Sequence, residues 1–232
     1  MDLPVNEIIC GDCLEVMKGW PDNCVDLVLT DPPYGKQWAR GVHGWGWDKS
    51  NNEKFESVSW DTSRPPKSAF DIILLVGNNQ IIWGGNYFAD LFPPSNCWLV
   101  WDKFGDMDNG TCFCDCELAW TSFRSVVKMK TIRQCGFITD SKEERTHPTQ
   151  KPLLLMLWCL ENYSKPTDLI LDPFCGSGTT CVAAKMLGRN YIGIDISEEY
   201  CEIARQRIKA VDTGVPVKEQ QAGQMSLFAG KG

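Results

Sequence analysis

The motif TDPPY, residues 30–34, places a carboxylate and an aromatic ring at the end of an apolar run. Pro32 disfavours helix at Asp31, and the pair Pro32-Pro33 fixes the turn that follows. Asp31 should therefore lie at the carboxyl end of a strand, where open α/β sheets bind ligands. A carboxylate beside backbone carbonyls offers only acceptors, which suits an NH₂ group, and Tyr34 could lie flat on the ring that bears it. A plain strand-turn remains the alternative.

A second motif, LDPFCGSGTT at residues 171–180, has the composition of a ligand-binding turn between a strand and a helix. Gly176 and Gly178 would let the backbone approach a ligand closely. Asp195 ends the next apolar run, at the spacing where an acidic residue accepts hydrogen bonds from ribose hydroxyls in nucleotide-binding folds. This spacing suits NAD equally well, and a tight turn without any ligand also remains open.

The elements that must position these residues alternate between strand and helix. Apolar runs predict strands near 5–10, 24–31, 80–85, 168–174 and 190–197. Helices are predicted to begin at residue 13 and to span 65–76, 152–164, 176–188 and 197–211. Gly188 should stop one helix and Ser197 should cap the next. NCWLVWDK and DCELAWTSF are predicted as antiparallel late strands, whereas 123–147 has no clear periodicity. The pattern predicts an α/β fold with a doubly wound, mostly parallel sheet and an antiparallel edge.

Composition limits the classes of partner. The chain has 232 residues, enough for one core, and a formal net charge of -7, which argues mildly against nucleic acid. Residues 122–151 nevertheless carry seven basic and three acidic side chains, which is compatible with DNA or with a solvated face. Without an apolar run of roughly 18 residues or a leader pattern, we expect no membrane contact and a cytoplasmic location.

Twelve cysteines raise the question of metal binding. Cys112, Cys114 and Cys116 alternate with other residues, which predicts one buried face of a strand. Structural zinc sites prefer a C-x₂₋₄-C pair together with a second pair of ligands, and the chain has only two histidines, His43 and His147. We therefore expect no metal, and reduced thiols.

Together, TDPPY, DPFCGSGTT, HPTQKP at 147–152 and IICGDC at 8–13 resemble motifs of the beta group of S-adenosylmethionine-dependent amino DNA methyltransferases. The order, with the catalytic motif before the cofactor motif, is similar to the circular permutation of that group. The resemblance spans roughly residues 7–210. It implies a Rossmann-like methyltransferase fold, with S-adenosyl-L-methionine as the cofactor and DNA as the substrate.

The resemblance also implies roles for individual residues. The catalytic motif would be Asp31, Pro32, Pro33 and Tyr34. Asp195 would hold the ribose of the cofactor, and Ile196 would contact the cofactor's adenine ring. Asp12, with Cys13 adjacent, would accept from the amino group of that ring. Thr149 and Lys151 would contact the methionine carboxylate. The methionine half of the cofactor would be surrounded by Asp172, Phe174, Cys175, Gly176, Ser177, Gly178 and Thr179.

The expected reaction is methyl transfer to the exocyclic N6 of an adenine that has flipped out of double-stranded DNA. Aspartate in this motif favours adenine within the family, and cytosine N4 is the alternative. A methyltransferase acting on RNA or protein nitrogen, a DNA-binding module that has lost catalysis and an NAD-dependent enzyme are the other readings. A partner restriction enzyme would be a separate chain.

The domain prediction is a methyltransferase domain over 1–211, with target-recognition insertions near 36–65 and 103–146. Residues 212–232 are polar and Gly-rich, which predicts a flexible tail. Within it, QMSLF (Gln224 to Phe228) resembles the peptides that bind the bacterial sliding clamp; an incidental apolar pair is the alternative. A homodimer also remains open.

Overall fold

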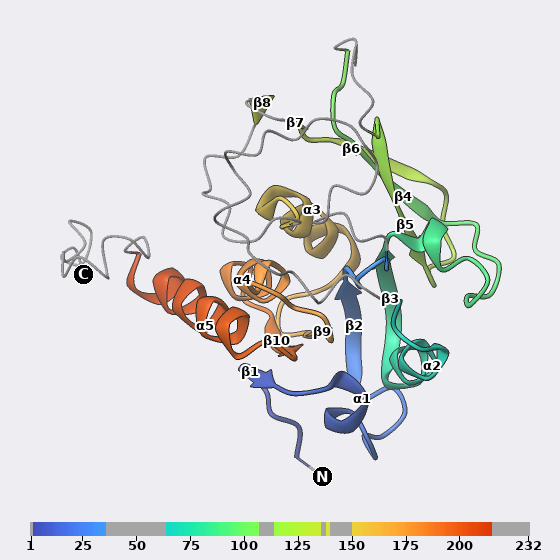
Figure 1. The fold of residues 1–232 in the computed structure, drawn as a ribbon. Coiled ribbons are helices and arrows are strands. Elements are labelled where there is room, and N and C mark those ends of the chain that lie inside the picture. Colours follow the sequence, from blue (N-terminus) through green and yellow to red (C-terminus); the bar gives the residue numbers. More distant parts are fainter. Residues whose placement is uncertain (1, 36–63, 107–113, 136–137, 140–149, 215–232) are drawn as a thin grey trace.

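The architecture is a twisted sheet between two groups of helices, seen in a computed structural model of the chain (Figure 1). The structure describes residues 2–35, 64–106, 114–135, 138–139 and 150–214. Eight of the described strands form one sheet in the order β1-β10-β9-β2-β3-β5-β4-β6. Their bounds are Glu7–Cys10 (β1), Val25–Thr30 (β2), Gly77–Trp83 (β3), Trp98–Asp102 (β4), Cys116–Thr121 (β5), Lys128–Thr131 (β6), Leu169–Asp172 (β9) and Asn190–Asp195 (β10). Gln134–Cys135 (β7) and Ile138–Thr139 (β8) form a separate antiparallel pair.

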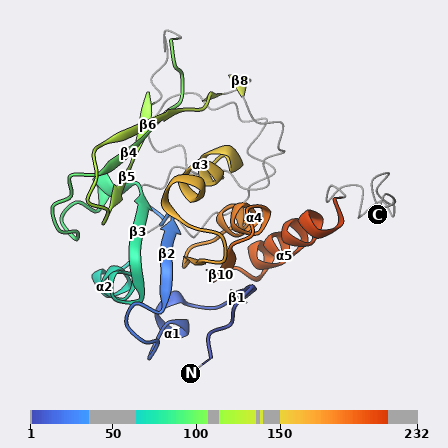
Figure 2. The same ribbon diagram turned by 180° about the vertical axis from the view of Figure 1, so that it is seen from behind.

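The helices cover both faces of the sheet, as the doubly wound prediction requires. Figures 1 and 2 show one group of helices on each side of the sheet. Alternate residues of β2 serve the two sides: Leu27 and Leu29 belong to the core cluster under the first group, and Val28 belongs to the cluster under the second. The first group is Leu153–Tyr163 (α3), Thr179–Met186 (α4) and Glu198–Thr213 (α5); the second is Cys13–Val16 (α1) and Lys67–Val76 (α2), with a 3₁₀ turn at Gly85–Tyr87 (η3).

The sheet is mostly parallel, which confirms the predicted fold class. Parallel pairing joins β1, β10, β9, β2 and β3, whereas β5 pairs antiparallel with both β3 and β4. The antiparallel pairing predicted for NCWLVWDK and DCELAWTSF is therefore confirmed. The sequence did not predict β6, which pairs parallel with β4 at the edge of the sheet, because all four of its residues are exposed and have no apolar period.

Helix ends follow the local chemistry of the chain. The Ser197 side chain accepts from the backbone N–H of Tyr200 and caps α5, and Gly188, with φ of +70°, follows the end of α4. α5 continues to Thr213 and ends at Gly214 in the left-handed conformation, so the predicted start of the tail at 212 is two residues too early. The predicted buried strand face of cysteines is wrong for Cys114 and Cys116, which are exposed; Cys112 lies outside the described residues.

Among the described residues, no group of three or more His, Cys, Asp or Glu side chains is placed to hold a metal ion. Within the same residues, none of the helices has the length and apolar character needed to cross a membrane.

Candidate active site

The two predicted motifs lie side by side because their strands are neighbours. β2 and β9 pair in parallel, with Val28 opposite Leu171, so both strands end at the same edge of the sheet. The last residue of β2, Thr30, donates from Oγ1 to Asp172 Oδ1 at the end of β9 over 2.6 Å. This buried hydrogen bond joins the TDPPY turn directly to the glycine-rich turn.

Asp31 lies at the centre of a compact polar cluster. The Tyr34 hydroxyl donates to Asp31 Oδ1 over 2.5 Å, and the Lys151 ammonium donates to Asp31 Oδ2 over 2.5 Å. Lys151 Nζ also lies 3.3 Å from the Tyr34 oxygen and 3.0 Å from Glu117 Oε2. On the far side of Glu117, Lys103 Nζ lies 2.5 Å from Oε1. The result is a chain of alternating charges from Lys103, just after β4, through Glu117 of β5 and Lys151 to Asp31 of the TDPPY turn.

Burial and pairing set the protonation of this cluster in opposite directions. Burial raises the pKa of Asp31 above its ordinary value, and the Lys151 ammonium opposes that rise. Burial also tends to raise the pKa of Glu117, but Lys151 and Lys103 together lower it to about 2. Burial would lower the pKa of Lys151, yet the two carboxylates raise it above its ordinary value. The Lys151 side chain, only 8% exposed, therefore keeps its positive charge inside the site.

The ring of Tyr34 occupies a slot that glycine makes possible. Gly84, at φ of +69°, follows β3, and a Cβ there would overlap the Tyr34 ring. Tyr87 lies on one side of that ring, with centroids 4.7 Å apart and planes tilted by 41°, and Phe88 approaches it edge-on. Burial and the adjacent Asp31 carboxylate raise the pKa of the Tyr34 hydroxyl well above its ordinary value, so it remains a donor.

The glycine-rich turn is held open between β9 and α4. Gly176 has φ of +49° and no atom within 4 Å of a Cβ built on it, so its backbone faces open space. The Gly176 N–H donates to Asp195 Oδ2 over 2.8 Å, which ties the turn to the end of β10. Gly178, at φ of +80°, serves packing instead, because a Cβ there would meet Ala204 of α5 at 2.7 Å.

The remaining residues of the LDPFCGSGTT motif either line the glycine-rich turn or hold it in place. The Asp172 carboxyl is buried, and burial raises its pKa to about 6 against the opposing hydrogen bonds. The Cys175 side chain is buried in the core, so only its backbone can face a ligand at this turn. Phe174 is partly buried against the opposite core cluster. Ser177 and Thr179 are buried and both bind Arg207 Nη1, at 3.0 Å for Ser177 Oγ and 3.1 Å for Thr179 Oγ1.

The residues predicted to hold the nucleoside lie at the adjacent strand ends. Cys10 of β1 pairs with Asp195 of β10, which brings Asp12 near the same edge. Asp12 Oδ1 accepts from Leu14 N and Glu15 N as the N-cap of α1, which begins at Cys13. Asp195 accepts through Oδ1 from Ser197 N, and Ile196 beside it is 70% exposed. Thr149 lies outside the described residues.

Sequence reasoning missed several residues that build the site. Glu117, Lys103 and Arg207 are far from both motifs along the chain, and no motif marks them. Thr30 directly precedes Asp31, but only the pairing of β2 with β9 reveals that its hydroxyl binds Asp172. Lys151 was predicted at the methionine carboxylate of a cofactor; its contacts in the structure are with Asp31, Tyr34 and Glu117.

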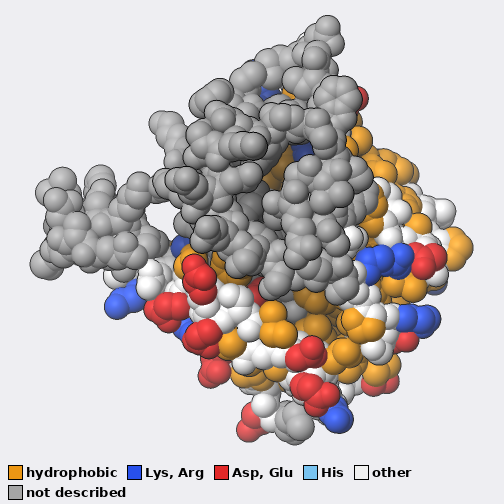
Figure 3. All heavy atoms as spheres, in the orientation of Figure 1, with side chains coloured by type: hydrophobic (Ala, Val, Ile, Leu, Met, Phe, Trp, Pro, Cys, Tyr) orange, Lys and Arg blue, Asp and Glu red, His pale blue; other side chains and the backbone are white. Residues whose placement is uncertain are grey.

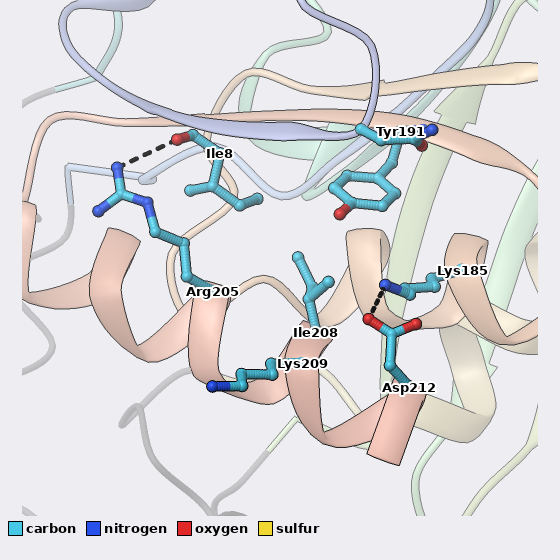
Figure 4. Close-up of a pocket in the computed structure, with 8 residues that line it drawn as sticks. Ile8, Lys185, Tyr191, Arg205, Ile208, Lys209 and Asp212 are labelled. Atoms are coloured by element: carbon cyan, nitrogen blue, oxygen red, sulfur yellow. Dashed lines mark hydrogen bonds and ion pairs between the residues drawn. The ribbon is translucent and has the colours of Figure 1, made fainter. Parts of the chain in front are cut away.

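A surface pocket elsewhere on the molecule is separate from this edge (Figure 4). Ile8 and Tyr191, near the amino ends of β1 and β10, line it together with side chains of α5. Three of its charged side chains are engaged, since Lys185 binds Asp212 and Arg205 donates to the Ile8 carbonyl. The pocket therefore contributes nothing to the cluster around Asp31.

Comparison with known proteins yields consistent matches. Residues 45–206 match the family model for N6/N4 DNA methylases, described as DNA methylase. Type II methyltransferase M.HinfI of Haemophilus influenzae is 31% identical over 89% of this chain and 69% of its own length.

Two solved structures share the fold. That of M1.HpyAVI in complex with S-adenosylmethionine is 25% identical, covers 87% of this chain and 98% of its own, and has a TM-score of 0.55. The structure of the cytosine-N4-specific PvuII DNA methyltransferase has a TM-score of 0.60 and covers 93% of this chain and 89% of its own. At 16% identity, this similarity shows a shared fold only.

Proposed function

Since the chain belongs to the N6/N4 DNA methylase family, we propose that it transfers a methyl group from S-adenosylmethionine to the exocyclic N6 of adenine in DNA. The observation that carries this proposal is the hydrogen bond between Thr30 and Asp172, which joins the acceptor turn to the glycine-rich turn. An amine held at Asp31 and a sulfonium held at the glycine-rich turn would then face each other across adjacent strand ends.

The acceptor turn suits a weakly nucleophilic amine. The lone pair of an exocyclic amine is delocalised into its ring, and hydrogen bonds from NH₂ to Asp31 and to a backbone carbonyl of the motif favour the pyramidal nitrogen. As the N–C bond forms, the S–C bond breaks and sulfur keeps its electron pair. Asp31 stabilises the positive charge that develops on nitrogen, and the methylated cation then releases one proton. Pro32 and Pro33 hold the turn in place for this step.

S-adenosylmethionine supplies the activated methyl group, and the edge from β9 to β1 would bind it. We assign the methionine half to the turn from Asp172 to Thr179, with Arg207 holding that turn from α5. The exposed side chain of Ile196 is available to the adenine ring, and the free oxygen of Asp12 is available to its amino group. We assign the ribose to Asp195, whose carboxylate the backbone already orients.

A basic edge supports DNA as the substrate despite the net charge of -7. Arg124, Lys128, Lys130 and Arg133 are exposed along the segment that contains β6, and residues 124–133 include no acidic side chain. Asp102 lies beside the end of β6, where Thr131 donates to it, but many other carboxylates lie away from this edge: Figure 3 shows them in the lower part of the view, where α5 and α1 lie in Figure 1. Phosphates would be attracted to the β6 edge and repelled by the surface of α5.

In a duplex, the amine of a stacked base cannot align with the methyl group, so the target base must flip out. Tyr34 would then stack on the flipped base beside Asp31. Most of the predicted insertion at 36–65 and part of the one at 103–146, which would read the target sequence, lie outside the described residues. The tail from 215 and its clamp-like segment Gln224 to Phe228 lie outside them as well.

Nucleoside mass spectrometry tests the proposal directly. Purified protein is incubated with unmethylated genomic DNA and S-adenosylmethionine, and the digested nucleosides are separated. N6-methyladenine as the product supports the proposal, because an aspartate at position 31 favours adenine within the family. N4-methylcytosine as the product would show that the target base is cytosine and not adenine. In parallel reactions with tritiated S-adenosylmethionine, transfer of tritium to RNA or protein but not to DNA would contradict the proposal as a whole.

A further inference from the structure

The Lys151 ammonium is an unexpected group to find against the acceptor of a methylation site. It donates to Asp31 Oδ2 over 2.5 Å, and its charge is opposite to that of the carboxylate it touches. A carboxylate alone accepts from any N–H, including the ring N–H of guanine or thymine. An ammonium beside it adds a donor at a fixed place and turns a general acceptor into a paired acceptor and donor.

The position of Lys151 is fixed from behind. Glu117 Oε2 lies 3.0 Å from Lys151 Nζ, and Lys103 holds the other oxygen of Glu117 over 2.5 Å. Lys103 therefore orients Glu117, and Glu117 orients Lys151, without either of them reaching Asp31. Two cations and two carboxylates balance in charge, so this partly buried arrangement does not leave a lone charge away from water.

The Tyr34 hydroxyl reveals what the pair is suited to bind. That single oxygen donates to Asp31 Oδ1 over 2.5 Å and lies 3.3 Å from Lys151 Nζ, from which it accepts. A donor toward Asp31 next to an acceptor toward Lys151 is also the pattern of an amino group beside an unprotonated ring nitrogen. Adenine presents it as N6 and N1, and cytosine as N4 and N3. Guanine and thymine present an oxygen acceptor beside a ring N–H, which reverses the pattern.

We infer that Lys151 is a specificity-determining residue that donates a hydrogen bond to the ring nitrogen beside the target amine while Asp31 accepts from that amine. The inference rests on the proposed function. When the ring of Tyr34 stacks on the flipped base, its hydroxyl leaves the pair, and the edge of the base takes its place. The paired contact then selects an amino base over an oxo base.

The test removes the ring nitrogen and keeps the amine. A duplex carries 1-deaza-2′-deoxyadenosine at the target adenine, with CH in place of N1, and transfer is compared with the natural duplex. For the wild-type chain, kcat/KM should fall by about 10- to 100-fold, the usual value of one paired base contact. In Lys151→Met the natural duplex should react more slowly, and the ratio between the two duplexes should approach one.

Matched variants separate this role from folding and from cofactor binding. Lys18→Met removes an exposed lysine that lies outside this cluster and should keep the wild-type ratio. Lys151→Met/Glu117→Gln also removes the charge of Glu117, which loses one of its two ammonium partners in the single variant, and it should show the same ratio near one. In both Lys151 variants, titration should give a dissociation constant for S-adenosylmethionine within about threefold of wild type.

Two results would overturn the inference. One is an equal discrimination against the deaza duplex in wild type and in Lys151→Met. The other is loss of cofactor affinity with unchanged discrimination, which would place Lys151 at the methionine carboxylate instead. Failure of the proposed function is distinguishable from both, because the wild-type chain would then methylate neither duplex.

Discussion

At the scale of single residues, Asp172 carries a protonation state that folding alters. The residue is 4% exposed, and burial raises the pKa of its carboxyl from 3.8 to about 6 in the folded chain. Between those two values the folded chain holds a proton that the unfolded chain has lost. Stability from this group is therefore present below pH 3.8 and is lost as pH rises to 6.

Asp172→Asn should remove the loss of stability that wild type undergoes as pH rises from 3.8 to 6. The amide stays neutral, so at pH 7.5 the variant should gain up to about 3 kcal/mol of unfolding free energy relative to wild type, from roughly two pKa units of 1.36 kcal/mol each. The advantage should shrink as pH approaches 4. Urea unfolding at a series of pH values measures both effects. A stability difference that does not change with pH between 4 and 7 would show that the carboxyl is not shifted upward.

What the sequence could reveal at this scale depended on local spacing. The two prolines after Asp31, the glycines of the second motif and Asp195 are recognisable because the chemistry lies within a few adjacent residues. The Lys151–Glu117–Lys103 cluster was not predictable in the same way. Its members come from three different segments, and Glu117 in sequence is one carboxylate among many.

At the scale of elements, β6 is the exposed edge that we propose contacts DNA. Lys128 and Lys130 alternate with Met129 and Thr131 and stand clear of the core. Lys128→Gln/Lys130→Gln should lower the magnitude of the slope of log K against log salt by about 2 if each lysine neutralises one phosphate. The rate at saturating DNA should stay near the wild-type value. Fluorescence anisotropy at several salt concentrations measures the slope.

Lys18→Gln is the matched control for this pair. The Lys18 side chain is 75% exposed and lies beside Glu15, just beyond α1 and on the opposite side of the sheet from α5. Its removal should leave the salt slope unchanged. A double β6 variant with the wild-type slope would exclude this edge from the interface.

Elements with a buried face were predictable, and those without one were not. β2, β3, β9 and β10 are buried for most of their length, so continuous apolar runs identified them. β6 has four exposed residues and depends on hydrogen bonds to β4, which leave no trace in hydropathy. The cysteine alternation misled for a related reason: Cys114 lies before β5 begins, and Cys116 is at the exposed start of that strand.

At the scale of the whole molecule, strand order brings the chemistry together. Asp31 and Asp172 are separated by most of the chain, yet β2 and β9 are adjacent in the sheet, with β10 and β1 beyond them. The carboxyl ends of all four strands therefore form one continuous edge (Figure 1). The acceptor turn is at one end of that edge and the proposed nucleoside contacts are at the other.

Asp31→Ala tests this division most directly. Lys151 keeps Glu117 as a partner in the variant, so the cluster retains one of its ion pairs. The dissociation constant for S-adenosylmethionine, measured by calorimetry, should stay within about threefold of wild type, because Asp31 does not contact the cofactor in this account. Methyl transfer to DNA should fall by at least about 1000-fold, the cost of losing a charge-stabilising group at the reacting centre. Transfer at the wild-type rate would contradict the account.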